Sequence, residues 1–177
     1  MRDPDGGPQV VRPSTTAPIG AVRVNGRPAI PIATLSAETP GTIRTIPSWL
    51  TAFIARQSRG SPIAPGTDPQ LAPFTAKGRA LFNQRQGQLN LACTNCHDEN
   101  WDKRLAGSAI TQAHPTGYPL YRLEWQTLGS LQRRLRACLT GIRAQPFDFG
   151  APELVELELF LMSRAQGMPI EAPAVRP

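Results

Sequence analysis

Two cysteines and a histidine stand together in the sequence "CTNCH". Cys93 and Cys96 are separated by two residues, and His97 follows the second cysteine directly. In c-type haem attachment, two thiols at this spacing form thioethers to the porphyrin vinyl groups, and the adjacent histidine binds the iron. The sequence therefore predicts one covalently bound haem c, held by Cys93, Cys96 and His97.

Two other chemistries use cysteines at this spacing. Together with Cys138 and one histidine, Cys93 and Cys96 would complete a tetrahedral ligand set for zinc. A redox-active pair of Cys93 and Cys96 is the second alternative, but such pairs belong to a thioredoxin-like βαβ unit that this sequence lacks. A histidine directly after the second cysteine is required by neither alternative, so haem is favoured over both.

The third cysteine, Cys138, lies in the arginine-rich sequence "RRLRACLTG". Arg134 stands four residues before it, and therefore on the same face of a helix, while Arg133 and Arg136 crowd nearby. Neighbouring cations lower the pKa of a thiol and favour the thiolate, the form that binds metals or attacks sulfur. We therefore expect a functional thiol at Cys138, against the alternative of a small apolar core residue.

From these residues alone, the second axial ligand of the iron has four candidates: Cys138, His114, Met162 and Met168. Methionine is the common choice in electron-carrier cytochromes. However, Met162 falls on the packing side of a predicted helix, Met168 stands next to a proline in a tail, and His114 lies in a proline-containing loop. A core or structural role is the more common one at each of these three positions.

Four helices are expected to position these residues. Apolar residues recur at helical spacing over 46–60, from about residue 73, over about 127–142 and from about residue 151. The second helix contains "AKGRALF", which suits the helix that crosses the C-terminal helix in a cytochrome c. Segments 46–63 and 151–170 also resemble each other, which indicates either two similar domain ends or a chance match between amphipathic helices.

Proline and glycine mark the boundaries of the compact part. The 177 residues include 19 prolines and 15 glycines, which crowd into 1–72 and 144–177. We expect an extended Pro-rich segment over 1–64, the remnant of a first cytochrome-like domain, ending in the 46–60 helix. An all-α, cytochrome c-like haem domain with a C-terminal tail is expected over 65–177.

The charge of the chain narrows the class of partner. The net charge is +6, but no lysine-rich run or aromatic-basic alternation supports a nucleic-acid partner. A small oxyanion or an acidic protein face fits as well. No apolar run approaches the ~20 residues that span a bilayer, and the N-terminal sequence has no signal-peptide core.

The motifs together resemble the SoxA cytochromes of thiosulfate oxidation. The resemblance covers about 47–173 and is carried by "SRGSPI", "KGRALFNQRQGQLNLACTNCHDENW", "GYPLYRLEW", "LGSLQRRLRACLTGIRAQP", "LELFLMSR" and "GMP". It implies that His97 and Cys138 are the two axial ligands of one haem, and that Cys138 is catalytic and carries an extra sulfur atom as a persulfide.

The resemblance also implies how the substrate would be held. Arg134 matches the arginine that binds the anionic thiosulfate in this family. A second substrate cation follows the haem motif in relatives; Lys103 and Arg104 are its closest matches, and we carry Arg104 forward.

The activity implied is that of an L-cysteine S-thiosulfotransferase. Thiosulfate would be joined oxidatively to a cysteine of the SoxYZ carrier protein, and two electrons would leave through a partner cytochrome, SoxX. Covalent haem is fitted outside the cytoplasm, so a periplasmic location is expected, with the leader not visible in this sequence. The alternative is a simple electron-transfer cytochrome in which Cys138 is not catalytic.

Overall fold

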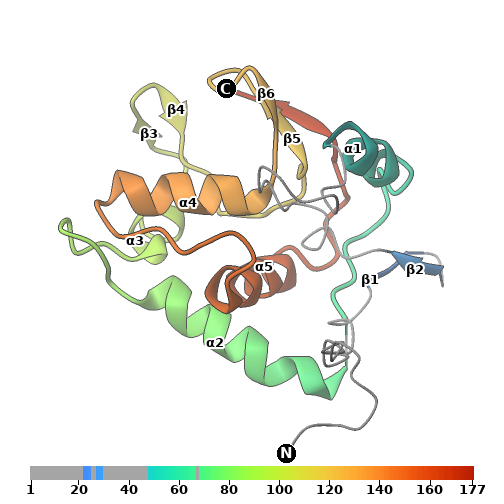
Figure 1. Cartoon of the computed structure of the whole chain (residues 1–177), viewed down its shortest axis with the longest axis horizontal. Helices are drawn as coiled ribbons and strands as arrows, with labels where there is room; N and C mark the ends of the chain where they lie inside the picture. Colours follow the sequence, from blue (N-terminus) through green and yellow to red (C-terminus); the bar gives the residue numbers. More distant parts are fainter. Residues whose placement is uncertain (1–21, 25–26, 30–47, 67) are drawn as a thin grey trace, which may run out of the picture.

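The structure is a computed structural model that describes residues 22–24, 27–29, 48–66 and 68–177. At its centre, helix α5 (Pro152–Arg164) lies between α2 (Ala72–Asn83) and α4 (Leu131–Gly141), as Figure 1 shows. A core forms where the three helices meet; its buried members are Phe82, Leu131, Leu157, Phe160 and Leu161. The helices expected from about residue 73 and about residue 151 are therefore confirmed, each with a proline in its first turn.

Gly78 lets α2 and α5 approach closely. A Cβ atom at this position would lie 2.0 Å from the carbonyl oxygen of Glu156 and 2.9 Å from the Cβ of Phe160. Backbone atoms of α5 cannot move away as a flexible side chain could. The crossing of the glycine-containing helix over the C-terminal helix, expected from "AKGRALF", is present.

Gly78→Ala is expected to destabilise the fold. Overpacking a tight contact costs about 1–3 kcal/mol, which outweighs the roughly 1 kcal/mol that alanine gains over glycine in helix propensity. Gly141→Ala in α4 is the control, because a Cβ there meets nothing within 4 Å. Denaturant midpoints should fall for the first variant and stay or rise for the second; equal midpoints would contradict the close approach.

The all-α prediction needs correction, because the described residues also form three small sheets. Strand β5 (Leu120–Arg122) pairs antiparallel with β6 (Thr127–Gly129) and parallel with the C-terminal β7 (Ala174–Arg176). Two hairpins, β1 (Val22–Val24) with β2 (Arg27–Ala29) and β3 (Arg104–Leu105) with β4 (Ser108–Ala109), form the other sheets. Each sheet is short and lies outside the helical core.

The expected helix over 127–142 begins four residues late for a local reason. Its first three residues belong to β6, where Leu128 pairs with Tyr121. The helix then starts at Leu131, because the Ser130 side chain accepts a hydrogen bond from the backbone N–H of Arg133 at 3.1 Å. A serine in this position caps a helix and fixes its first residue.

The two similar segments of the sequence contact each other through their ends. Helix α1 (Ser48–Arg56) is followed by residues 60–63, which pair antiparallel with 167–170. The backbone N–H of Gly60 donates to the carbonyl of Ile170, and that of Gly167 donates to the carbonyl of Ile63, each at 2.8 Å. The N–H of Ile63 likewise donates to the carbonyl of Met168, and the N–H of Ile170 to the carbonyl of Ser61. Residues at equivalent places in the two segments thus make equivalent hydrogen bonds, as an antiparallel pairing centred on Pro62 and Pro169 requires. The internal repeat therefore stays a prediction.

One carboxyl group is buried in the helical core. Glu158 on α5 is 6 % exposed, and it accepts a hydrogen bond from Gln132 Nε2 at 3.1 Å. Gln132 in turn accepts from the backbone N–H of Gly150 at 2.8 Å. Burial raises the pKa of Glu158 to about 7, and the hydrogen bond from Gln132 opposes part of that rise.

This carboxyl group predicts a pH dependence of stability. Between the ordinary pKa of about 4.5 and the native value of about 7, the folded state binds more protons than the unfolded state. Stability should therefore fall as the pH rises through this window, by up to about 1.4 kcal/mol per pH unit. Glu158→Gln should flatten unfolding free energies measured from pH 5 to pH 8, whereas Glu156→Gln on the same helix should not; an unchanged slope in Glu158→Gln would contradict this origin.

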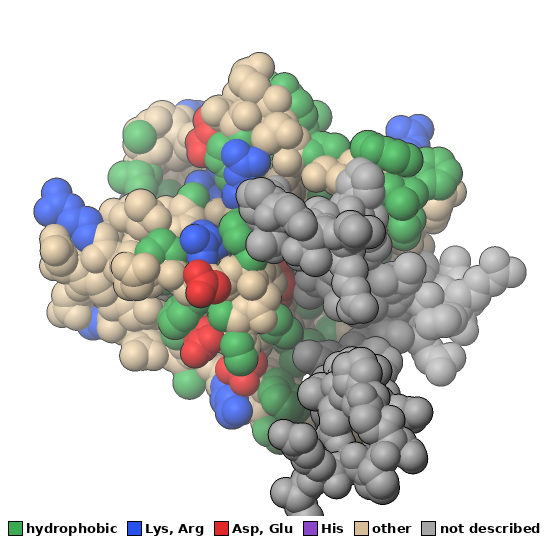
Figure 2. Space-filling view, in the orientation of Figure 1, with side chains coloured by type: hydrophobic (Ala, Val, Ile, Leu, Met, Phe, Trp, Pro, Cys, Tyr) green, Lys and Arg blue, Asp and Glu red, His purple; other side chains and the backbone are tan. Residues whose placement is uncertain are grey.

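The face of the molecule drawn in Figure 2 shows no continuous basic patch among the described residues. On the side drawn in Figure 2, the Lys and Arg side chains of the described residues lie apart from one another, with acidic and apolar side chains between them. Within the described part of the chain, no helix is both long and apolar enough to cross a membrane.

Candidate functional site

The CTNCH sequence forms the short helix α3 (Cys93–His97). Its start is fixed by Asn95, whose side-chain oxygen accepts from the backbone N–H of Ala92 at 2.9 Å. Both thiols are free and partly buried, and Cys93 packs against the helical core. Burial is the main cause that raises the pKa of Cys93 to about 11, and the neighbouring charge of Cys138 adds to it.

The imidazole of His97 is held by a main-chain carbonyl. Its Nδ1 lies 2.5 Å from the carbonyl oxygen of Thr111. A carbonyl can only accept, so Nδ1 carries the proton and Nε2 keeps its lone pair for a metal. Burial lowers the pKa of His97, and the positive charge of Arg134 contributes to the lowering, which favours this neutral form.

The structure brings Cys138 to the haem motif. Cys138 lies on α4, and its charge raises the pKa of Cys93. The charge of Cys96 in turn raises the pKa of Cys138. The positive charge of Arg134 lowers the pKa of both Cys138 and His97. The predicted residues Cys93, Cys96, His97, Arg134 and Cys138 therefore lie within electrostatic range of one another, although about forty residues of sequence separate the two motifs.

The predicted low pKa of Cys138 is wrong in direction. Burial is the largest effect and raises this pKa, while the positive charge of Arg134 opposes the rise. The other two arginines point elsewhere: Arg133 stacks on the ring of Trp125 at 4.4 Å, and Arg136 stacks on Phe149 at 4.6 Å. A buried thiol of this kind ionises readily only next to a metal or another cation.

Arg122 is a further cation near Cys138 that sequence reasoning missed. It lies on β5, is 7 % exposed, pairs with Glu124 at 2.9 Å and stacks on Trp125 at 5.3 Å. Its charge lowers the pKa of Cys138 and of Tyr118. The sequence offered one signal. If "YPLYR" forms a strand, its alternate side chains face the same side, so Arg122 lies on the same face as the apolar Leu120.

The predicted second substrate cation lies in an exposed hairpin. Arg104 donates to the carbonyl of Gly107 at 2.8 Å within the β3–β4 hairpin, and Lys103 donates to Asn100 at 2.7 Å. Among the described residues, no hydrogen bond or ion pair joins either side chain to α4. Arg104 thus keeps its role only as a prediction.

The other candidate ligands have separate places in the fold. Met162 and Met168 pack against the apolar cluster that joins α1 to the C-terminal segment, whose buried members are Ala55, Ile63, Ala165, Ile170 and Ala172. Both methionines are therefore core residues of that cluster. Burial lowers the pKa of His114, and the charge of Arg164 on α5 adds to the lowering.

The donor set fits a covalent haem better than zinc. Two free thiols and an oriented imidazole lie on one helix, with a third thiol near them on α4. In the part of the chain that the structure describes, no group of three or more His, Cys, Asp or Glu side chains is arranged to hold a metal ion. The zinc alternative therefore gains no support.

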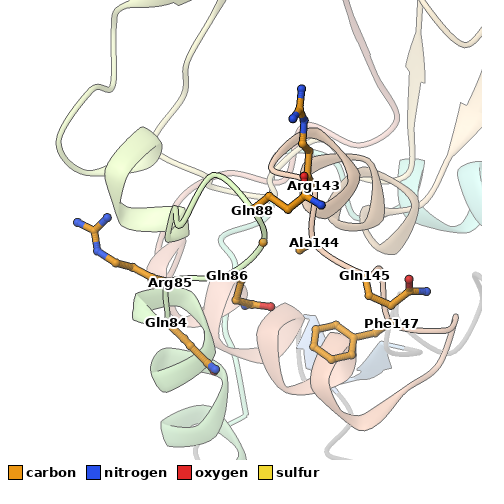
Figure 3. Close-up of a pocket in the computed structure, with 9 residues that line it drawn as sticks. Gln84, Arg85, Gln86, Gln88, Arg143, Ala144, Gln145 and Phe147 are labelled. Atoms are coloured by element: carbon orange, nitrogen blue, oxygen red, sulfur yellow. The ribbon is translucent and has the colours of Figure 1, made fainter.

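A separate open pocket of about 570 Å³ is formed by residues that shortly precede the haem motif in the sequence and by residues that follow α4 (Figure 3). Residues 84–88, 143–145 and 147 line it. The backbone N–H groups of Gln88 and Leu89 donate to the carbonyls of Arg143 and Ile142, each at 3.3 Å. None of the predicted haem-binding residues lines this pocket. Its walls carry amide and guanidinium groups and no nucleophile.

Comparisons with known proteins agree on one family. The family described as SoxA/TsdA, cytochrome c domain, matches residues 77–170. The L-cysteine S-thiosulfotransferase subunit SoxA of Rhodovulum sulfidophilum is 37 % identical over 127 residues, which cover 72 % of this chain and 44 % of that protein. The subunit of the same name from Allochromatium vinosum is 34 % identical over 149 residues, which cover 81 % of this chain and 53 % of that protein.

A solved structure shows the same fold. The crystal structure of SoxXA from P. pantotrophus matches with a TM-score of 0.69 and 32 % identity, covering 71 % of this chain and 48 % of that one. The chain therefore spans about half the length of the curated relatives that it matches.

Proposed function

Because this chain belongs to the SoxA/TsdA cytochrome c domain family, we propose that it is a haem c enzyme subunit of sulfur oxidation. The proposed activity is that of an L-cysteine S-thiosulfotransferase, the enzyme for which its relatives are named. One observation supports the proposal: the charges of Cys138 and Arg134 act on residues of the haem-binding motif, so a thiol, a cation and an oriented histidine lie within electrostatic range of one another.

The proposed reaction joins two sulfur atoms. A carrier-protein thiol loses its proton, and its sulfur bonds to the outer sulfur of thiosulfate; forming this S–S bond releases two electrons. A bound haem c supplies the electron-accepting centre of the subunit, and a SoxX-type partner cytochrome takes the electrons onward. The solved SoxXA relative supports a partner of that kind.

The chain's own residues would perform three tasks. Cys93 and Cys96 form the covalent attachment, while Thr111 holds His97 with Nε2 free to ligate. Cys138 would be a second ligand to the haem iron and, as a persulfide, would supply the sulfur that meets the substrate. Arg134 offers a guanidinium fork to the sulfonate oxygens, which suits a tetrahedral oxyanion and offsets its repulsion from a thiolate.

The remaining parts of the proposal concern context. We place the protein in the periplasm, where covalent haem is fitted, with a SoxYZ-type carrier as the second substrate. The haem domain is assigned to 65–177, and segment 1–64 to the remnant of a first cytochrome-like domain. In this assignment each of the two similar segments closes a unit, and the hydrogen bonds between residues 60–63 and 167–170 join their ends.

Mass spectrometry of natively isolated protein tests this function directly. A peptide containing residues 93–97 should carry one haem, and a peptide containing Cys138 should carry one added sulfur atom. Haem on the first peptide with an unmodified thiol at Cys138 would favour the electron-transfer cytochrome instead. Protein that contains stoichiometric zinc and no covalent haem would overturn both.

A further inference from the structure

Arg164 joins three parts of the haem domain that are distant in sequence. It is the last residue of α5, and its guanidinium stacks on the ring of Phe82 at 4.8 Å. Its Nη2 lies 2.6 Å from Asp98 Oδ1 and 3.3 Å from the carbonyl oxygen of Gln112. The side chain is 23 % exposed, so this ion pair is shielded more than a typical surface pair.

Both partners of Arg164 are direct neighbours of the groups that hold the imidazole. Asp98 follows His97 in the chain, and Gln112 follows Thr111, whose carbonyl accepts from His97 Nδ1 at 2.5 Å. The contacts therefore close a ring that runs from His97 through Asp98, Arg164 and residue 112 back to Thr111. Rotating or shifting the imidazole would break at least one of these contacts.

We propose that Arg164 is a positioning residue for His97, fixing its imidazole by tying Asp98 to the 111–112 segment. The proposal rests on the haem assignment of the proposed function. An arginine suits the task because its Nη2 atom carries two N–H donors and reaches both the carboxylate and the carbonyl, while the planar guanidinium stacks on aromatic rings as a lysine ammonium cannot. The rings of Phe82 and Phe160 hold the guanidinium plane from α2 and α5.

The test uses haem-loaded protein, four single variants and the Arg164→Gln, Asp98→Asn double variant. Arg164→Gln and Asp98→Asn each remove the ion pair, Arg164→Lys retains the charge without the fork, and Arg79→Gln is the matched control. Arg79 also stacks on the Phe160 ring, at 5.5 Å, but makes no hydrogen bond or ion pair to residues 97–112 in the described structure. The readouts are the high-spin fraction in the ferric EPR spectrum and the reduction potential, with thermal unfolding measured alongside.

Arg164→Gln and Asp98→Asn are each expected to raise the high-spin fraction, by shifting the equilibrium between bound and released histidine about tenfold. This is the low end of the affinity lost when a partner behind a metal-binding histidine is removed. The double variant should be no worse than either single one, because both remove the same link. Arg164→Lys should restore part of the low-spin signal, and Arg79→Gln should leave the spectrum unchanged.

Three results would overturn the proposal. These are unchanged spectra in both ion-pair variants, an equal change in Arg79→Gln, or strictly additive effects in the double variant. If Arg164→Gln does not accumulate as folded protein, Asp98→Asn decides alone, because its carboxylate is 41 % exposed and its replacement leaves no cavity. Wild-type protein without covalent haem would instead overturn the proposed function, so the two failures are distinguishable.

Discussion

Cys138→Ala is expected to abolish thiosulfate-dependent turnover while leaving haem attached to Cys93 and Cys96. The variant removes both the axial thiolate and the sulfur that meets the substrate, and losing a nucleophile of this kind costs about 10⁴-fold or more in rate. The low-spin, thiolate-type absorption spectrum should change in the same sample. Covalent attachment should persist, because the thioether cysteines lie on α3 and Cys138 lies on α4.

Thr140→Ala provides the control for this experiment. Thr140 is exposed on the same helix, and its hydroxyl donates only to the Arg136 carbonyl of its own α4 turn, at 3.1 Å. Its replacement should change neither spectrum nor rate. An intact spectrum and full turnover in Cys138→Ala would show that this cysteine is a bystander, and the electron-transfer alternative would then stand.

Arg134→Gln is expected to lower kcat/KM for thiosulfate by about 10- to 150-fold. A hydrogen bond to a charged group contributes roughly 1.5–3 kcal/mol, and each 1.4 kcal/mol corresponds to a tenfold change in rate. The substrate is a dianion, so losing its cation also exposes it to repulsion from the thiolate. Steady-state rates measured over a range of thiosulfate concentrations would give this ratio.

The neighbouring arginine is the matched control for Arg134. Arg133 has the same charge and lies on the same helix, but its guanidinium is stacked on Trp125. Arg133→Gln should therefore leave kcat/KM within about twofold of wild type, which is under 0.5 kcal/mol. Equal losses in both variants would indicate a general effect of positive charge on α4 and would contradict a specific anion contact at Arg134.

Several features of the helices could be predicted from the spacing of residues in the sequence. The four-residue spacing of Arg134 and Cys138 predicted a shared face, and the electrostatic effect of one on the other agrees with it. The crossing of α2 over α5 followed from a glycine inside an otherwise helical segment. The first feature depends on residues close in sequence. The second joins Gly78 to the distant Glu156 and was expected because "AKGRALF" suits the helix that crosses the C-terminal helix in a cytochrome c.

Other features that depend on distant residues were missed or predicted wrongly. The inward position of Arg122 requires β5 to pair with β6 and with β7, which lies more than fifty residues away. The pKa of Cys138 was misjudged because counting nearby arginines says nothing about burial, the larger effect. Arg133 and Arg136 are equally close to Cys138 in sequence, yet aromatic rings on other segments hold both of them.

The paired ends of the two similar segments have a consequence for assembly. Gly60 and Ile63 in one segment occupy the same places as Gly167 and Ile170 in the other, so the contact has the approximate twofold form of the interfaces that join identical subunits in a dimer. Covalent linkage favours the intramolecular pair through its high effective concentration, and a substitution that releases one strand would open the chain to domain-swapped exchange between molecules.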